Sequence, residues 1–504
     1  GSGTGLELKG SGGGGAAAMV LLNGGSVTVS SGPLGEVTSI AGGRGGDGLL
    51  GGGGGAGAFL YNGGMLSLEA GSIAGGGGGN GDGMSGAGGV GILSNLGEVR
   101  NDATITGGAC GSGRNFMQNT AGTGLVYHGD GGAGIKAWGG QIINGHSGLI
   151  AGGNGGGTDY NNTTALSGNG GAGVFFTDGQ PAYLENHGTI TGGTGGSWPS
   201  GQAQPGRGGA GIVGASSGGT HIVNDGAIFG ALSGDGVTRA NAVELFGSNN
   251  RFEVWAGADV LGDVSVATGG SDNAFVLGGA SDGAFDLSRL GSTGQFSGFD
   301  TFGKTGISTW TVSGDAEPAM GWVIEEGTLQ GSTTSIKGNV ANAGTLIFDE
   351  TVDGVFLGDL SGFNGAAGMV IKRGAGTLRL EGSSLLDWSV QDGELLVSAH
   401  SFSGDVELDG ASTVLTFSDT SPGLYGGVIS GNGILQFAAS YPVLLTGDSS
   451  SFTGTTRLLS GTLLVGVGEP GASLGGNMEV LSGGVLVGSG TLGSGAGSRV
   501  TIGA

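Results

Sequence analysis

Two short signatures alternate along the first half of the 504-residue chain at a nearly fixed distance. The first is a glycine element that ends in an apolar residue: GAGA (55–58), GVGI (89–92), GAGI (132–135), GAGV (171–174) and GAGI (209–212). The second is an Ile followed by a small residue and glycine: SIAGG (39–43), SIAGG (72–76), TITGG (104–108), LIAGG (149–153), TITGG (189–193) and AIFG (227–230). The steps 58→73, 92→105, 135→150, 174→190 and 212→228 span 15, 13, 15, 16 and 16 residues. Such a constant spacing predicts a repeat architecture.

The stretches that lead from the second signature back to the first vary widely in length, from a glycine run at 44–54 to long segments at 109–131 and 154–169. A constant part joined by variable loops is typical of stacked coils whose loops leave from one edge. We therefore expect an all-β fold, a right-handed parallel β-helix (β-solenoid) with glycine-rich loop insertions. Glycine is expected at the coil corners, where the backbone angles exclude other residues.

The composition and hydrophobic pattern of the sequence change near residue 246. Residues 1–245 form the glycine-rich repeat part with variable loops on one edge, and residues 246–504 form a C-terminal part with longer alternating strands. Examples are NRFEVWAGADVLGDVSV (250–266) and TRLLSGTLLVG (456–466), whose period of two predicts half-buried strands. Since no proline- or serine-rich linker marks the junction, we expect one continuous β-helix rather than two separate domains.

Composition excludes several other classes of protein. The 130 glycines come with only 8 prolines and no glycine at every third position throughout, which excludes collagen. Apolar residues make up 37% and charged residues 11%, unlike a disordered chain. A net charge of −24 with only 16 basic residues argues against nucleic acid and anionic lipid as partners. The longest apolar run, AAAMVLL (16–22), is too short for a membrane helix, so no membrane insertion is expected.

Residues 249–314 resemble a segment that recurs in the passenger domains of autotransporters (type V secretion) of Gram-negative bacteria. The motifs are RFEVWAGADVLGDV (251–264), DNAFVLGG (272–279), FDLS (285–288) and QFSGFDTFGKTGISTWTVSG (295–314). Downstream, LLTGDSSSFTGTTRLLSGTLLVG (444–466) resembles the autotransporter-associated β-strand repeat. VLSGGVLVGSGTLGSGAGSRVTIGA (480–504) resembles the stretch that precedes the passenger stem.

The resemblance implies a non-enzymatic passenger that is exported across the outer membrane and acts at the bacterial cell surface or as a secreted protein. Such a surface adhesin or virulence factor would bind a host surface protein, a host serum protein or a glycan. The passenger's own C-terminal β-barrel, which this sequence does not include, is a further implied partner. Two alternatives stay open: a carbohydrate-active β-helix enzyme, and a binder of a serum protein such as a complement regulator.

The stretch GFDTFGKT (298–305) matches the phosphate-binding pattern G-x-x-x-x-G-K-[ST] letter for letter. A phosphate-binding loop must follow a strand and open a helix whose N-terminus faces the anion. Here the alternating strand pattern GISTWTVSG (306–314) follows, and nothing helical. We therefore expect no nucleotide binding, and we expect Lys304→Ala to leave stability nearly unchanged.

Other motifs give weak indications of chemistry. GGRGGDGLL (42–50) fits one calcium nonapeptide, but a calcium site needs consecutive copies, so no metal or other cofactor is expected. GDSSS (447–451) departs from the serine-protease motif GDSGS, and the five histidines (128, 146, 187, 221, 400) are scattered, so no catalytic triad is expected. The acidic groups 325–326 and 349–353 are expected to be solvated turn positions rather than glycosidase pairs.

Ligand contact is expected on the edge that carries the variable loops 109–131, 154–169 and 194–207. Recognition usually lies in loops held by a rigid scaffold, and exposed aromatic and arginine side chains dominate binding energies. The candidate ligand-contact residues are Phe116, Tyr127, His128, Tyr160, Trp198 and Arg207.

Overall fold

The computed structural model describes residues 11–32, 35–113, 126–157, 165–197, 204–316, 320–469, 471–493 and 498–503. The chain divides into two compact units, the first comprising Gly1–Phe275 and Gly291–Asp300 and the second Val276–Leu290 and Thr301–Ala504. The boundary between the units therefore lies after residue 246, where the composition of the sequence changes. The predicted fold class is confirmed: the described residues form an all-β parallel β-helix, and their only helix is the 3₁₀ turn η1 (Leu287–Arg289).

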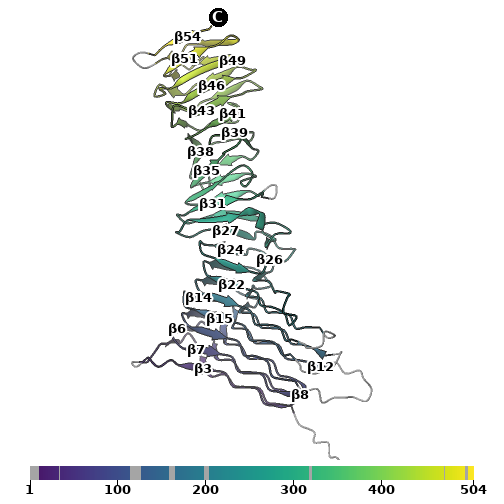
Figure 1. Ribbon diagram of the computed structural model, residues 1–504. Coiled ribbons are helices and arrows are strands. Elements are labelled where there is room, and N and C mark those ends of the chain that lie inside the picture. Colours follow the sequence, from purple (N-terminus) through teal and green to yellow (C-terminus); the bar gives the residue numbers. More distant parts are fainter. Residues whose placement is uncertain are drawn as a thin grey trace, which may run out of the picture. The chain divides into compact units, whose positions relative to one another are not determined.

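The first unit contains three long parallel sheets, and each of its first seven coils contributes one strand to each sheet (Figure 1). Sheet one runs β1 (Met19–Leu21), β5 (Ala58–Leu60), β9 (Ile92–Asn95), β13 (Ile135–Trp138), β17 (Val174–Phe176), β20 (Ile212–Val213), β23 (Val243–Leu245), β26 (Val264–Val266) and β29 (Phe296–Ser297). Sheet two includes β2 (Ser26–Val29), β6 (Met65–Leu68), β10 (Glu98–Asn101), β14 (Gly140–Asn144), β18 (Ala182–Asn186), β21 (Thr220–Asn224) and β24 (Arg251–Val254), and β27 (Ala274–Leu277) contains the unit boundary. Sheet three runs β3 (Ser39–Ala41), β7 (Ser72–Ala74), β11 (Thr104–Thr106), β15 (Leu149–Ala151), β19 (Thr189–Thr191), β22 (Ala227–Phe229) and β25 (Asp259–Leu261).

The two sequence signatures set the register of sheets one and three. The apolar ends of the glycine elements pair in order, for example Ile92 with Ile135, and are fully buried. The isoleucines of the second signature also pair in order, for example Ile105 with Ile150, and these two are fully buried. Because each coil buries its apolar residues only against its neighbours, the constant step between signatures reflects the fixed path from sheet one through sheet two to sheet three.

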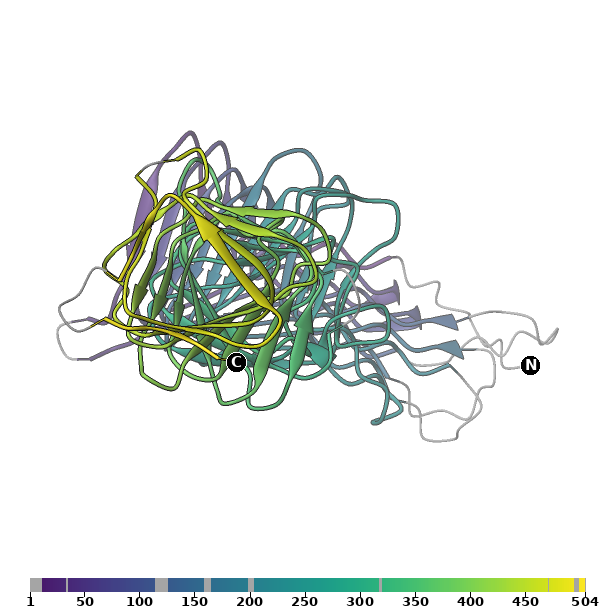
Figure 2. The ribbon, with the colours of Figure 1, turned by 90° about the horizontal axis from the view of Figure 1, so that it is seen from above.

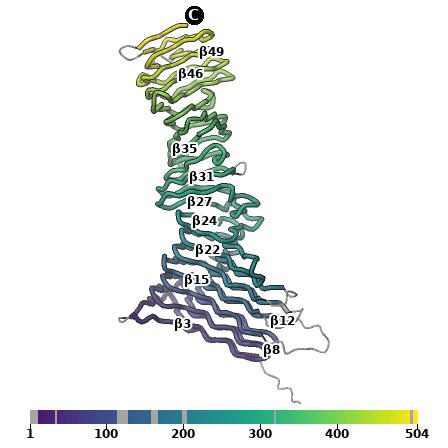
Figure 3. Tube along the Cα trace, in the orientation of Figure 1, coloured from purple at the N-terminus to yellow at the C-terminus, as the bar shows by residue number. Residues whose placement is uncertain are grey.

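Between sheet three and the next strand of sheet one, the chain forms a structure that we call the glycine array. Its outgoing segments are 42–47, 75–80, 107–112, 152–157 and 192–197, and its returning segments are 51–57, 86–91, 129–134, 168–173 and 206–211. Figures 1 and 2 show these segments extending to one side of the coils of the first unit, and Figure 3 traces them as adjacent lines. They end near the short strand pairs β4 (Gly48–Leu50) with β8 (Gly81–Met84) and β12 (Val126–Tyr127) with β16 (Ala165–Leu166).

Hydrogen bonds in the glycine array repeat every three residues. Gly42 and Gly45 donate to the next outgoing segment, at Ala74 O and Gly77 O. Gly76 and Gly79 donate instead across to the returning segment 51–57, at Gly55 O and Gly52 O. A period of three without bonds inside a segment is the pattern of polyproline II helices, not of β-strands. The glycines therefore build two bonded layers rather than the corners that the sequence suggested.

In the segments of the array, the first two positions of each triplet are glycine except at Cys110, because the layers approach each other closely. A Cβ atom on Gly54 would lie 1.8 Å from Gly76 O, and one on Gly132 would lie 1.9 Å from Gly89 O. At the third position the space is open, since a Cβ on Gly53 would find its nearest atom 3.9 Å away. Side chains are accordingly found at third positions, where they point away from the opposite layer. This packing resembles the axis of collagen, where only glycine fits.

A row of buried asparagines closes successive strands of sheet two. Asn101, Asn144, Asn186 and Asn224 occupy matching register positions, and each is at most 1% exposed. The Nδ2 of each of the first three donates to the Oδ1 of the next asparagine, at 2.8, 2.8 and 2.7 Å. Because an unpaired buried amide costs free energy, this continuous row of side-chain hydrogen bonds fixes the register of the coils. The row also satisfies the polar groups of the turns at which the asparagines lie.

The second unit also consists of parallel strands. It contains β30 (Thr301–Lys304), β32 (Trp322–Ile324), β34 (Val340–Asn342) and β37 (Leu360–Ser361) in one row. A second row runs β28 (Gly283–Asp286), β31 (Thr309–Ser313), β33 (Thr328–Gly331), β35 (Thr345–Asp349), β38 (Met369–Arg373), β40 (Asp387–Val390), β42 (Val406–Leu408) and β45 (Ile429–Gly431). A third group holds β36 (Gly354–Phe356), β39 (Thr377–Leu380), β41 (Glu394–Val397), β43 (Val414–Phe417), β46 (Ile434–Ala438), β49 (Thr455–Val465), β47 (Val443–Leu445), β44 (Gly423–Tyr425), β51 (Asn477–Val480), β52 (Gly484–Gly488) and β54 (Val500–Ile502). A small separate sheet holds β48 (Asp448–Ser449), β50 (Ser473–Leu474) and β53 (Thr491–Leu492).

Two buried lysines stabilise turns in the second unit. Lys304, at the end of β30, is fully buried, and its Nζ donates to the carbonyl oxygens of Thr305 at 2.7 Å and Gly306 at 2.6 Å. Lys372 in β38 is equally buried and donates to Arg373 O and Gly374 O at 2.8 and 2.6 Å. The lysine of GFDTFGKT thus binds its own backbone, and the next regular element in the second unit is strand β31, not a helix.

This burial corrects the expectation that Lys304→Ala is neutral. We expect Lys304→Ala to destabilise the protein by about 3 kcal/mol, because the substitution leaves a cavity and removes charge-assisted hydrogen bonds to buried carbonyl groups. Lys337→Ala is the control, since Lys337 pairs with the exposed Asp315 and a surface ion pair contributes about 1 kcal/mol at most. Urea unfolding measures both variants, and equal losses would contradict a structural role for Lys304.

Candidate functional site

A pocket of about 580 Å³ lies in the first unit where the returning segments of the glycine array begin. It is lined by Met84, Ser85, Ala87, His128, Gly129, Asp130, Leu166, Ser167, Asn169, Gln204, Pro205 and Arg207. Three adjacent coils place nine of these residues directly after the sequence positions 114–125, 158–164 and 198–203, the centres of the three variable loops, and the preceding coil contributes Met84, Ser85 and Ala87. A pocket of this volume is large enough for a small ligand or for an anchoring side chain of a protein partner.

Stacking arranges the pocket residues in two columns. Gly86, Gly129, Gly168 and Gly206 lie against one another in successive coils. The residue before each glycine forms the inner column of Ser85, His128, Ser167 and Pro205. The residue after each glycine is a third position of the array and forms the outer column of Ala87, Asp130, Asn169 and Arg207. The fold therefore brings together side chains that lie 120 or so positions apart in the sequence.

The side chains of His128 and Ser167 in the inner column are buried and have no hydrogen-bond partner among the described residues. His128 is 7% exposed and Ser167 is 9% exposed, and neither ring nitrogen nor the Ser167 Oγ has a partner in the described part of the chain. The His128 ring lies so close to Gly113 that a Cβ there would be 2.5 Å from Nδ1. Burial lowers the pKa of His128, so its imidazole is neutral at physiological pH and offers one donor and one acceptor.

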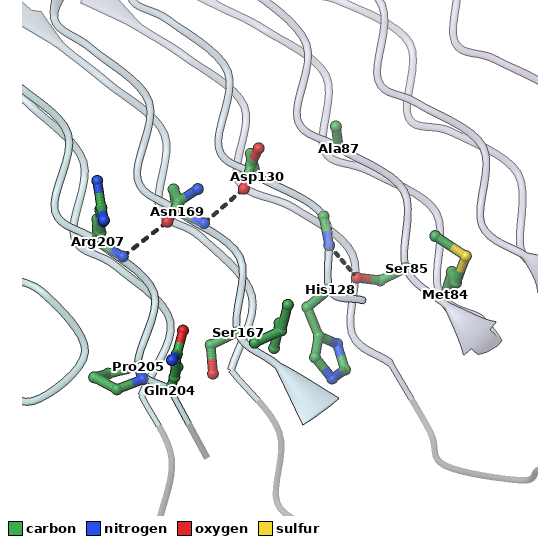
Figure 4. A pocket seen from close by; sticks show the side chains of 12 residues that line it. Met84, Ser85, Ala87, His128, Asp130, Ser167, Asn169, Gln204, Pro205 and Arg207 are labelled. Carbon is green, nitrogen blue, oxygen red and sulfur yellow. Dashed lines mark hydrogen bonds between the residues drawn. The ribbon is translucent and has the colours of Figure 1, made fainter. Parts of the chain in front are cut away.

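The outer column forms a polar ladder along the mouth of the pocket (Figure 4). Asp130 Oδ1 accepts the backbone N–H of Asn169 at 2.6 Å, and Asn169 Oδ1 accepts the backbone N–H of Arg207 at 2.8 Å. Each side-chain oxygen thereby binds the third-position N–H of the next coil, which the glycine array leaves unused. The exposed guanidinium of Arg207 forms no hydrogen bond or salt bridge with the described residues and can bind a carboxylate or another acceptor on a ligand.

Cys110 lies in the outgoing segment beside the pocket. A Cβ on Gly156 would meet both Cys110 Sγ, at 2.6 Å, and His128 Cβ, at 3.2 Å. Burial, together with the charge of Asp130, raises the pKa of the Cys110 thiol to about 11. The thiol is therefore protonated at neutral pH and is a poor nucleophile and metal ligand.

Of the six predicted contact residues, the fold brings His128 and Arg207 together in this pocket. Tyr127 ends β12 beside it, but its side chain is outside the described structure, and Phe116, Tyr160 and Trp198 fall outside the described residues altogether. Asp130, Asn169 and Ser167 were not among the predicted residues. The signal for Asp130 and Asn169 is the repeat GDGGAG (129–134), GNGGAG (168–173) and GRGGAG (206–211), in which one polar residue recurs at one place of the glycine triplet.

Other motifs of the sequence have structural partners. Asp47 of GGRGGDGLL is a third-position residue whose Oδ1 accepts from Arg44 at 2.9 Å and from Asn80 N at 2.7 Å. Ser449 of GDSSS is buried and accepts from Ile429 N at 2.9 Å. Glu350 is 2% exposed rather than solvated, and its carboxylate accepts the N–H of Thr333. Among the described residues, no group of three or more His, Cys, Asp or Glu side chains is placed to hold a metal ion.

Three of the five histidines are less scattered than the sequence suggested. The rings of His146 and His187 lie 5.2 Å apart, and His187 Nδ1 and Nε2 contact Asp225 at 2.7 Å and Glu185 at 2.9 Å. His221 lies 3.9 Å from Glu253 in the same sheet. Burial alone would lower the pKa of His187, but Asp225 and Glu185 outweigh burial and raise it. Both ring nitrogens of His187 are thus paired with carboxylates and leave no free group there for a ligand.

Comparisons with known protein families and with curated proteins find no match. The resemblance to autotransporter passengers therefore rests on the motifs quoted from the sequence. In the described residues, no helix is both long enough and apolar enough to span a membrane.

Proposed function

We propose that the protein is a non-enzymatic, passenger-type binding protein of the bacterial surface or its surroundings, which contacts a host or neighbouring-cell ligand at the pocket edge of the glycine array. The main support is that the residues directly after three variable segments, His128 and Arg207 among them, line one pocket. The array forms this edge from its own backbone hydrogen bonds and the polar ladder, so the segments that leave it can vary without disturbing the coils.

The chemistry of the pocket favours recognition over catalysis. His128 and Ser167 are not hydrogen-bonded to each other, so these two residues do not make the base–nucleophile pair that acyl transfer requires. The neutral imidazole and the hydroxyl instead supply donors and acceptors, and the Arg207 guanidinium supplies further donors, beside apolar walls from Met84 and Leu166. A protein surface that presents a carboxylate next to an apolar side chain matches this arrangement.

The test is to measure binding of the purified chain to cultured epithelial cells and to immobilised serum proteins. Connectors of Gly and Ser replace residues 114–125, 158–164 or 198–203, which leaves the glycine array intact. We expect unchanged melting, and a loss of at least about fivefold in affinity for at least one connector variant and for Arg207→Ala. Arg100→Ala is the matched control, because Arg100 is an exposed arginine that pairs with Glu98 away from the pocket.

Normal binding by all three connector variants and by Arg207→Ala would contradict the proposal and place the contact surface elsewhere. Turnover of a glycan panel that depends on one carboxylate pair would favour the enzyme alternative instead.

A further inference from the structure

A second hollow, of about 440 Å³, lies in the first unit at the turns that join sheet one to sheet two. Each of four successive coils contributes one turn: the chain passes through Tyr61, Leu96, Trp138 and Gly179 between strands of the two sheets. We call this hollow the aromatic groove. It is separate from the pocket that contains His128, since the two share no lining residue.

The floor of the aromatic groove is made of large apolar side chains that face solvent. Tyr61 is 43% exposed, Leu96 47% and Trp138 36%. The Tyr61 ring packs on Phe59 with centroids 5.9 Å apart and planes tilted by 56°. Exposed rings that line a hollow, rather than standing singly on the surface, are typical of ligand sites.

Leu96 has an unusual backbone for its side chain. Its φ is +56°, whereas the equivalent turns use Asn62 with Gly63, or Gly139 with Gly140, at positive φ. A leucine in this left-handed region is strained, and such strain clusters at binding sites. The turn thus retains an exposed apolar side chain where glycine or asparagine would be easier to accommodate.

Polar groups at the rim are amides and one carboxylate. Asn95 pairs in register with Trp138 one coil away, and Gln180 lies in the fourth turn. Asp178 already accepts from Ser216 Oγ at 2.5 Å and from Ser217 N at 2.9 Å. The hydrogen bond from Ser216 lowers the pKa of Asp178 most, and the bond from Ser217 lowers it further. The carboxylate is therefore ionised at neutral pH. None of the residues that line the groove is Lys, Arg or His.

The spacing of the two rings limits the shapes of ligand that can contact both. Tyr61 and Trp138 are two coils apart, which is about 10 Å at the spacing of paired strands. Rings that are spread along the stack do not enclose a point, as a cage for a quaternary ammonium ion must. They suit an extended molecule that presents flat apolar faces at intervals and hydroxyl groups between them.

We infer that the aromatic groove binds an uncharged oligosaccharide, whose sugar rings stack on Tyr61 and Trp138 and whose hydroxyls bond to Asn95, Gln180 and Asp178. The ionised Asp178 and the lack of a basic lining residue exclude an anionic glycan on grounds of charge. This site lies outside the proposed protein-binding edge, so the full chain would hold two separate ligand surfaces.

The test titrates the full chain with neutral hexasaccharides of glucose and of N-acetylglucosamine, with polygalacturonate and heparin as anionic probes, and with choline as a cationic probe. Tryptophan fluorescence and calorimetry report binding. We expect a neutral hexasaccharide to bind, and Tyr61→Ala and Trp138→Ala each to weaken it by at least about fivefold. Tyr441→Ala is the control, because Tyr441 is a 48% exposed tyrosine in the second unit.

Three results would overturn the inference: no binding of any neutral hexasaccharide, preferential binding of an anionic probe or of choline, or binding that both groove variants retain at full affinity. A Trp138-dependent dimer in light scattering without sugar binding would also overturn it and mark a self-association surface. Because the connector variants of the loop edge keep the groove, they should bind the sugar normally, so failure here and failure of the proposed protein binding are distinguishable.

Discussion

Replacing Gly54 by alanine should destabilise the first unit severely although the change adds one methyl group. The new Cβ would lie 1.8 Å from Gly76 O and 2.7 Å from Gly89 N, and both atoms belong to backbone that is itself hydrogen-bonded. Backbone in two bonded layers cannot move aside as a side chain does. We therefore expect a loss of about 3 kcal/mol or more, at the upper end of what overpacking costs.

The neighbouring Gly53 supplies a matched control within the same run of glycines. Its Cβ would find its nearest atom 3.9 Å away, and its φ is not in the left-handed region. Gly53→Ala should therefore be neutral, or stabilising by up to about 1 kcal/mol through the lower entropy of the unfolded chain. Urea titration followed by circular dichroism compares the two variants. Equal stability of Gly54→Ala and Gly53→Ala would refute the layered packing.

The second large effect is expected at the centre of the asparagine row. Asn144→Leu keeps the approximate volume of the side chain but removes both of its polar groups. Asn186 Oδ1 then loses the donor that lies 2.8 Å away, and Asn101 Nδ2 loses its nearest acceptor. Because both groups are buried and water does not replace the lost partner, we expect the free energy of unfolding to fall by about 3 kcal/mol.

The same substitution at an exposed position provides the comparison. Asn154 is an exposed third-position residue whose Oδ1 accepts the backbone N–H of Thr194 at 3.0 Å. Water can replace that bond, so Asn154→Leu should cost about 1 kcal/mol or less. If Asn144→Leu melts at the same temperature as the parent chain, the row of amides does not hold the coils in register.

The coil register could be predicted from the sequence because it depends on a few apolar residues at constant steps. Ile92 and Ile105 are buried for the reason that the repeat implies: each coil covers the next. The buried asparagines were predictable in principle, since Asn101, Asn186 and Asn224 each stand four residues before the isoleucine of the second signature. They were missed because a polar residue at a strand end is usually solvated, and only tertiary stacking buries this one.

The glycine array was not predicted, although its signal is in the sequence. GGRGGDG (42–48) has the three-residue period of a polyproline II helix, but each coil holds only two or three triplets between strands. The period is therefore masked wherever the third residue is itself glycine, as at Gly53 and Gly77. The pocket could be predicted only in part, for the same reason. His128 and Arg207 were identified as loop residues, whereas the places of Asp130 and Asn169 in the pocket are found only once the triplets are aligned.

Residue-resolved amide hydrogen exchange tests the glycine array most directly. In the runs 51–55 and 75–79, every residue is glycine, so intrinsic exchange rates differ little. Gly51, Gly52, Gly54 and Gly55 donate backbone hydrogen bonds, and so do Gly75, Gly76, Gly78 and Gly79. Gly53 and Gly77 donate none among the described residues.

The array predicts two slow amides, one fast amide and two slow amides in each run. Five fast amides, or an alternation of slow and fast amides with period two, would contradict it.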